Sequence, residues 1–187
     1  MRILIIGASG SGTSTLGKTI ASEYDWSFCD ADDYYWLPTT PPFQEKRDHT
    51  ARLEMMLNDI NGHGNAVVSG SIMNWGIELE NSFDLIVFLY LETNIRVKRV
   101  KKREESRFGL VDPKFLKWLS EYDTGPSEGR SLAKHNAWLG ERKARVIRIE
   151  GDLTVQERVA IVRGAFPLRE QAADAKSARA VENVTNA

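Results

Sequence analysis

A glycine-serine loop near the N-terminus carries the clearest chemistry in this sequence. Residues 7–15 fit the phosphate-binding pattern G-x-x-x-x-G-K-[ST] except at the lysine, where Thr13 stands. Glycine adopts backbone conformations that a Cβ would hinder, and it lets a phosphate approach the peptide N–H groups. A helix that begins at the loop adds its positive end, so an anion can bind without a side-chain cation. A plain glycine turn is the alternative. The predicted nucleotide contacts are Gly7, Ala8, Ser9, Gly10, Ser11, Gly12, Thr13, Ser14 and Thr15.

The missing lysine bears on catalysis more than on binding. Ser14 occupies the position whose hydroxyl normally ligates Mg²⁺ on the outer phosphates of ATP. Thr13 cannot supply the positive charge that follows a phosphoryl group through transfer. Lys18 is the nearest candidate in sequence, but it lies about 140° around the helix from Thr13, as a solvated residue would. The loop therefore fits either a kinase with another cation or a nucleotide-binding sensor with little turnover.

Three carboxylates follow the second predicted strand, at Asp30, Asp32 and Asp33. Ligands of open α/β sheets bind beyond the carboxyl ends of the strands, where these acids fall. Alternation along an extended chain would place Asp30 and Asp32 on one side, so that one holds Mg²⁺ and the other accepts the proton of a substrate hydroxyl. An acidic turn that caps the next helix is the alternative, chiefly for Asp33.

Aromatic residues and prolines fill residues 34–43, a stretch that we expect not to form regular helix. It would suit the wall of an acceptor site. Arg47 and Arg52 follow and fit an anionic acceptor or, equally, a solvated helix face.

The elements that must position these residues alternate between strands and helices. The apolar run at residues 2–6 suits a strand covered on both faces, and Leu16, Ile20 and Tyr24 form the apolar stripe of a following helix. Alternation of this kind predicts a parallel α/β sheet with right-handed crossovers. A capping box at Thr154 and Glu157 predicts a last helix. The other predicted strands are residues 26–30, 66–70, 84–91 and 145–149.

Composition indicates one soluble domain, which we place at residues 1–168, followed by a flexible tail at residues 169–187. With 25 basic and 26 acidic residues the net charge is −1, so neither nucleic acid nor a membrane is expected as a partner. The single cysteine excludes an internal disulfide and, with no secretory signal apparent, favours a cytoplasmic location. A monomer or homodimer is expected. The three histidines lack metal-ligand spacing.

Taken together, these motifs resemble the small P-loop kinases of the adenylate-kinase and shikimate-kinase type over residues 1–166. The chain is especially similar to a bacterial AAA-type ATP-binding subgroup with a lysine-less Walker A loop, on the residues Asp30–Trp36, Pro41–Phe43 and Ser69–Ser71. The resemblance implies an α/β P-loop NTPase fold, with a five-stranded parallel sheet in the order 2-3-1-4-5 flanked by helices. It also implies an acceptor-binding insertion at about residues 34–60 and a lid at about residues 104–130.

The same resemblance implies roles for individual residues. Asp30 would serve the metal together with Ser14, and Asp32 would bind the acceptor. Ser69, Gly70 and Ser71 would contact the acceptor, in addition to Arg47, which its position after the aromatic segment suggests. A bare turn after the third strand is the alternative for Ser69–Ser71. The sequence has no Walker B aspartate at the end of that third strand.

Arginines complete the implied site. Arg99 and Arg103 show the spacing of a pair in which one arginine stacks on the base and the other contacts the phosphates. Arg107 and Arg130 bracket the lid, and with Arg103 they would offset the lost lysine. The expected activity is ATP- and Mg²⁺-dependent transfer of the γ-phosphoryl group to a small acceptor, either a nucleoside monophosphate or a metabolite hydroxyl.

Overall fold

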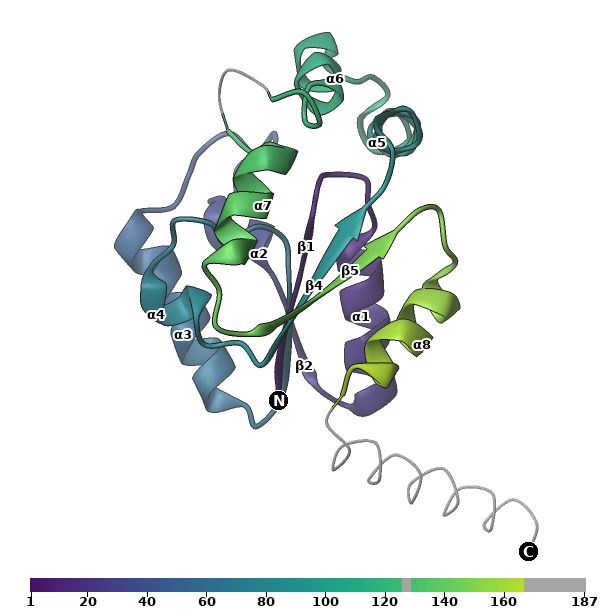
Figure 1. Ribbon diagram of the computed structural model, residues 1–187. Helices are drawn as coiled ribbons and strands as arrows, with labels where there is room; N and C mark the ends of the chain where they lie inside the picture. The colour runs from purple at the N-terminus through teal and green to yellow at the C-terminus, as the bar shows by residue number, and fades with distance from the viewer. Residues whose placement is uncertain (126–128, 167–187) are drawn as a thin grey trace, which may run out of the picture.

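The computed structural model describes residues 1–125 and 129–166, and the tail predicted at residues 169–187 lies outside them. Five strands form one parallel sheet in the order β2-β3-β1-β4-β5, which confirms the predicted topology (Figure 1). The strands are β1 Arg2–Gly7, β2 Ser27–Asp30, β3 Ala66–Ser69, β4 Leu85–Tyr90 and β5 Arg145–Glu150.

The central strand β1 is buried on both faces, as its continuous apolar run predicts. Leu4 and Ile6 pack on one face of the sheet, whereas Ile3 and Ile5 pack on the other. All four side chains are fully buried. A strand paired on both edges and covered on both faces needs apolar residues at successive positions, which explains why the sequence does not alternate.

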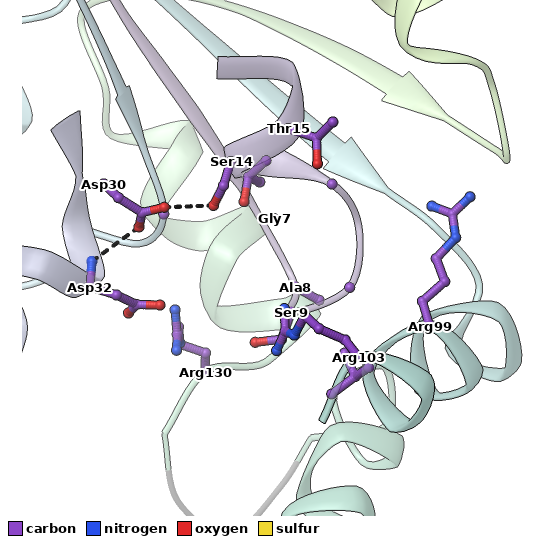
Figure 2. A pocket seen from close by; sticks show the side chains of 15 residues that line it. Gly7, Ala8, Ser9, Ser14, Thr15, Asp30, Asp32, Arg99, Arg103 and Arg130 are labelled. Carbon is purple, nitrogen blue, oxygen red and sulfur yellow. Dashed lines mark hydrogen bonds between the residues drawn. The ribbon is translucent and has the colours of Figure 1, made fainter. Parts of the chain in front are cut away.

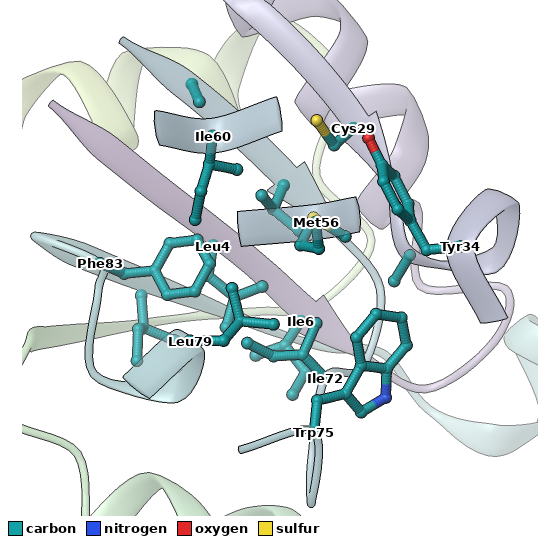
Figure 3. Packing of buried hydrophobic residues seen from close by; sticks show 14 of the residues in the cluster. Leu4, Ile6, Cys29, Tyr34, Met56, Ile60, Ile72, Trp75, Leu79 and Phe83 are labelled. Atoms are coloured by element: carbon teal, nitrogen blue, oxygen red, sulfur yellow. The ribbon is translucent and has the colours of Figure 1, made fainter. Parts of the chain in front are cut away.

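Helices cover both faces of the sheet. On one face α1 (Thr13–Tyr24) and α8 (Val155–Gly164) lie together over the sheet (Figure 1) and pack on Ile3 and Ile5. The predicted capping box of α8 is present. The other face is covered by α3 (His49–Gly62), α4 (Ile77–Glu80) and α7 (Leu132–Gly140). Figure 3 shows Met56 of α3 and Leu79 of α4 against Leu4 and Ile6 of β1.

A buried ion pair joins this second layer together. Glu80 Oε2 accepts hydrogen bonds from Trp138 Nε1 at 2.6 Å and from Arg142 Nη1 at 2.7 Å. Its Oε1 atom accepts a further bond from the peptide N–H of Trp75 at 3.1 Å. Both charges are thus paired away from water, and α4 is held to α7.

Two helices stand beyond the carboxyl ends of the strands, the first leading into the lid predicted at about residues 104–130 and the second lying within it. They are α5 (Thr93–Phe108) and α6 (Pro113–Ser120) (Figure 1). The fully buried Arg96 of α5 holds this region together. Its Nε donates to the carbonyl of Leu91, and its Nη2 bonds Thr93 and pairs with Asp123. In the part of the chain that the structure describes, no helix has the length and apolarity needed to cross a membrane.

The short helix α2 (Ala31–Tyr35) corrects two expectations. The chain does not continue as an extended strand past Asp30, and Tyr34 and Tyr35 are helical. The cause is local, because the Asp30 carboxylate accepts a hydrogen bond from the peptide N–H of Asp32 and so caps the helix.

Candidate active site

A cavity of about 380 Å³ opens at the carboxyl ends of β1, β2 and β3 (Figure 2). It brings together residues from the phosphate loop, the acidic turn, α5 and the segment after α6. Its lining consists of Gly7, Ala8, Ser9, Gly10, Gly12, Thr13, Ser14, Thr15, Asp30, Asp32, Gly70, Arg99, Val100, Arg103 and Arg130. Most of the residues predicted to contact ATP, metal or acceptor thus surround one space.

The loop is tightly folded at the start of α1. The peptide N–H of Ser11 donates to the carbonyl of Ala8 at 3.0 Å, and Gly12 is the N-cap residue with a φ of 97°. A Cβ at Gly7 would lie 2.6 Å from the carbonyl oxygen of Leu89, so the loop packs directly on β4. The first turn of α1 has N–H groups without intrahelical partners, and these favour an anion.

Helix α5 packs against the same loop. A Cβ at Gly10 would lie 2.7 Å from the carbonyl oxygen of Arg96. The phosphate loop is therefore in close contact with the helix that carries Arg99 and Arg103.

Ser14 and Asp30 form the oxygen-rich side of the cavity. The Ser14 hydroxyl donates to Asp30 Oδ2 at 2.7 Å (Figure 2). Ser69 Oγ lies 3.5 Å from Ser14 Oγ. Hydroxyl and carboxylate oxygens are the ligands that Mg²⁺ prefers, and Mg²⁺ is usually held by one or two carboxylates plus substrate phosphates. Over the described residues no group of three or more acidic, histidine or cysteine side chains forms a metal cage. The donor set therefore fits a magnesium ion that arrives with a nucleotide.

Asp32 lies in the cavity beside two arginines. Partial desolvation by the cavity walls raises the pKa of its carboxyl group, and the neighbouring Asp30 carboxylate raises it further. Arg130 and Arg103 act in the opposite direction. Figure 2 shows the Arg130 side chain directed toward the Asp32 carboxylate. The raised pKa makes this carboxylate a stronger base than a free aspartate.

The predicted arginines divide into two groups. Arg99, Arg103 and Arg130 line the cavity, and Arg99 also forms an ion pair with Asp152 in the loop after β5. Arg107, at the exposed end of α5, is not part of the described lining.

The predicted acceptor residues are also split. Gly70 lines the cavity, whereas Ser69 is buried beneath it and Ser71 Oγ lies 3.5 Å from His135 Nε2. His135 is fully buried and bonded to the Tyr122 hydroxyl through Nδ1. Burial, with a smaller effect of Arg130, lowers the pKa of His135 to about 3, so it is neutral at physiological pH.

Arg47 and Arg52 have different surroundings. Arg47 is not among the lining residues, and its Nε donates to the carbonyl of Tyr34 at 3.0 Å. The Arg52 guanidinium lies near the stacked rings of Tyr35 and Trp75, 4.7 Å from the centroid of Tyr35 and 4.9 Å from that of Trp75.

One residue beside the loop escaped the sequence interpretation. Arg158 of α8 donates from Nη1 to the carbonyl of Ser11 at 2.6 Å and from Nη2 to the carbonyl of Gly151 at 3.1 Å. Sequence position gives no signal for it, because it is 147 residues from Ser11 and stands in an ordinary amphipathic pattern.

Comparison with known proteins agrees with the geometry. Residues 3–109 match the sequence model of the AAA domain family. The chain is 36% identical over 167 residues to the uncharacterized protein YqaC of Bacillus subtilis, covering 84% of this chain and 92% of that protein.

Solved structures share the fold. Deoxyadenosine kinase from M. mycoides with bound dATP aligns with a TM-score of 0.57 at 18% identity, over 88% of this chain and 98% of that one. Shikimate kinase from Acinetobacter baumannii, in complex with shikimate, aligns with a TM-score of 0.55 at 16% identity, over 88% of this chain and 93% of that one.

Proposed function

The chain belongs to the AAA domain family as a small P-loop, kinase-like protein, and from that premise we propose that it is an ATP-dependent phosphotransferase. It transfers the γ-phosphoryl group of ATP to a small acceptor. The observation that carries this proposal is that one cavity is lined by the phosphate loop, by Asp30 and Asp32, and by arginines from α5 and from the segment after α6. A nucleotide site alone would not need the second carboxylate.

The triphosphate of ATP binds along residues 7–15, which line the cavity except at Ser11 and lead into the start of α1, whose free N–H groups favour an anion. Ser14 and Asp30 would hold Mg²⁺, which shields the charge of the outer phosphates when bound. The loop that carries Asp152, tied to Arg99, flanks the base end of the nucleotide.

Asp32 orients the acceptor and, for a hydroxyl acceptor, takes its proton as the oxygen attacks the γ-phosphorus. The bond from the γ-phosphorus to the bridging oxygen breaks, and ADP leaves with that electron pair. Arg103 and Arg130 neutralise the charge that spreads over the transferring oxygens. Arg107 could join them only through closure of the lid.

The acceptor is a metabolite hydroxyl or a nucleoside monophosphate. The basic character of Asp32 supports a hydroxyl, because a phosphate oxygen has no proton that must be removed. The charge of Arg52, which lies beside Tyr35 and Trp75 and outside the described lining of the cavity, would suit an anionic group elsewhere on the acceptor. We propose Gly70 as a direct acceptor contact, with Ser69, Ser71 and Arg47 as its supports.

A second candidate function is an ATP-binding sensor with little phosphoryl transfer. Thr13 supports it, because the cation normally attached to the loop is missing. Binding would then switch the position of α5, whose backbone at Arg96 contacts the loop at Gly10, and of α6, which Arg96 joins to α5 through the carbonyl of Leu119.

One experiment separates the two functions. Mg²⁺-ATP is titrated by calorimetry, and phosphoryl transfer is then measured against a panel of hydroxyl-bearing metabolites and nucleoside monophosphates, with the wild type and with Thr13→Lys. Transfer by either form supports the kinase. Binding of ATP without transfer to any acceptor by either form supports the sensor, and failure to bind any nucleoside triphosphate contradicts both.

A further inference from the structure

Arg158 is a buried arginine behind the phosphate loop for which the proposed reaction gives no role. Its exposed fraction is 4%. It joins two loops that are distant in sequence, because it bonds the carbonyl of Ser11 in the phosphate loop and that of Gly151 in the loop after β5. Removing a guanidinium from water is unfavourable unless its charge is compensated.

That compensation is incomplete among the described residues. The hydrogen bonds of Arg158 go to two carbonyls, and its buried Nε has no partner within that part of the chain. Burial and the nearby Arg99 lower the pKa of the guanidinium, whereas Asp152 raises it. Asp152 is itself paired with Arg99. The region behind the loop therefore holds an excess of positive charge that an anion in the cavity would balance.

The position of the guanidinium connects that charge to the loop. A Cβ at Gly12 would lie 3.0 Å from Arg158 Nη1, so the guanidinium sits directly against the backbone that lines the cavity. The Ser11 carbonyl and the Gly12 N–H belong to one peptide group. A cation that bonds the carbonyl polarises this group and makes its N–H a stronger donor.

We propose that Arg158 is a positioning residue that supplies, from behind the loop, part of the positive charge that a lysine at position 13 would supply. This inference rests on the proposed binding of ATP. Arg158 acts through the Ser11–Gly12 peptide and through the electric field of its buried charge. Both effects favour a ligand in proportion to the charge on its phosphates.

The test compares ATP, ADP and AMP by calorimetry in one Mg²⁺ buffer. Arg158→Gln keeps the first part of the side chain but loses the charge and, because its amide nitrogen stands at the place of Nε, the bond that Nη1 makes to Ser11. We expect it to weaken ATP binding about tenfold, ADP binding less and AMP binding least, whereas Arg158→Lys stays within about threefold of the wild type. Arg163→Gln removes a charge from an exposed position of the same helix and serves as the matched control. Equal losses for all three nucleotides would reduce Arg158 to a structural residue and overturn the proposal.

A lysine at position 13 provides the second arm. In the Thr13→Lys background the loss of ATP affinity from Arg158→Gln should fall below about threefold, because the two charges serve one anion. An undiminished loss of ATP affinity would refute the idea that Arg158 supplies charge in place of a lysine at position 13.

If Arg158→Gln does not fold, Arg158→Lys is tested in its place. Loss of the preference for ATP over AMP in Arg158→Lys would contradict the proposal. A wild type that binds no nucleotide defeats the proposed function as well, whereas a wild type and an Arg158→Gln variant that bind ATP equally defeat only this inference.

Discussion

Ser14 donates a 2.7 Å hydrogen bond to Asp30 Oδ2, which joins the first turn of α1 to the end of β2. The other oxygen of the same carboxylate accepts the peptide N–H of Asp32 at 3.2 Å. One carboxylate thus fixes the hydroxyl of the phosphate loop and the start of the helix that carries Asp32. The proposed metal and acceptor positions are set by a single side chain.

Asp30→Asn should weaken binding of Mg²⁺-ATP by about tenfold while changing the affinity for ATP in EDTA by less than about threefold, because the lost charge matters chiefly to the metal. Asparagine still caps α2, so the fold is retained. Calorimetry with and without Mg²⁺ measures the effect. Asp33→Asn, at the next helical position after Asp32, is the control. An equal loss with and without Mg²⁺ would remove the metal role of Asp30.

Asp32→Asn should lower turnover about 10²- to 10⁴-fold and leave the dissociation constant of ATP within about threefold, because the amide cannot accept the proton of the acceptor. Steady-state rates and nucleotide titrations on the same preparation measure the two effects. Parallel losses of turnover and ATP affinity would instead assign Asp32 to the metal or to the fold.

The raised pKa of Asp32 also predicts how stability depends on pH. The folded state binds the proton more tightly than the unfolded state, so this group reduces stability as pH rises from its ordinary value of 3.8 through the raised folded value. Asp32→Asn should therefore raise the free energy of unfolding at pH 7. The gain should shrink to nothing below pH 3.8. Urea unfolding across this range measures it, and a gain that persists at low pH would contradict the raised pKa.

Arg103→Ala should slow phosphoryl transfer about 10²-fold with little change in ATP affinity, because the guanidinium acts on charge that develops during transfer. Arg107→Ala should slow it less, since this residue lies outside the described lining of the cavity. Lys101→Ala, an exposed position on α5 paired with Glu105, is the control. Single-turnover rates measure the order of effects, and an unchanged rate in Arg103→Ala would exclude this arginine from catalysis.

Glu80→Ala should destabilise the fold by about 3–5 kcal/mol, because it leaves the charge of Arg142 buried without its partner. Glu141→Gln removes the exposed carboxylate that also pairs with Arg142, and we expect a change below about 1 kcal/mol. Urea unfolding measures both variants. Similar losses in the two would show that the buried position of Glu80 is immaterial.

Much of the scaffold was predictable because its signals are local. The apolar run of β1, the stripe of α1 and the capping box of α8 are each encoded within a few residues, and the resemblance implied the order of the strands. The same holds for the phosphate loop, whose spacing brings its predicted residues to the lining of one cavity, with the exception of the buried Ser11.

The remainder depends on contacts between distant segments. The sequence predicted Asp30 and Asp32 on one side of an extended chain. The chain instead enters α2 at Ala31, between the two residues, because the Asp30 carboxylate caps that helix. Arg158 could not be recognised in sequence, since its partners at Ser11 and Gly151 meet it only once the sheet has formed. The split between Arg103 and Arg107 likewise follows from how α5 meets the loop.

The cavity draws its two halves from parts of the molecule that are tied differently to the sheet. Asp30 and Ser69 are neighbours in the register of β2 and β3, and Ser69 is also paired with Ile5 of the central strand. Arg103 and Arg130 come instead from segments beyond the carboxyl ends of the strands. Amides around Asp30 and Ser69 should exchange with solvent deuterium only when the whole domain unfolds. Amides of α5 and α6 should exchange through local openings that need less free energy. In mild denaturant the segments that carry the arginines would therefore unfold first, and the phosphate loop would still bind the triphosphate.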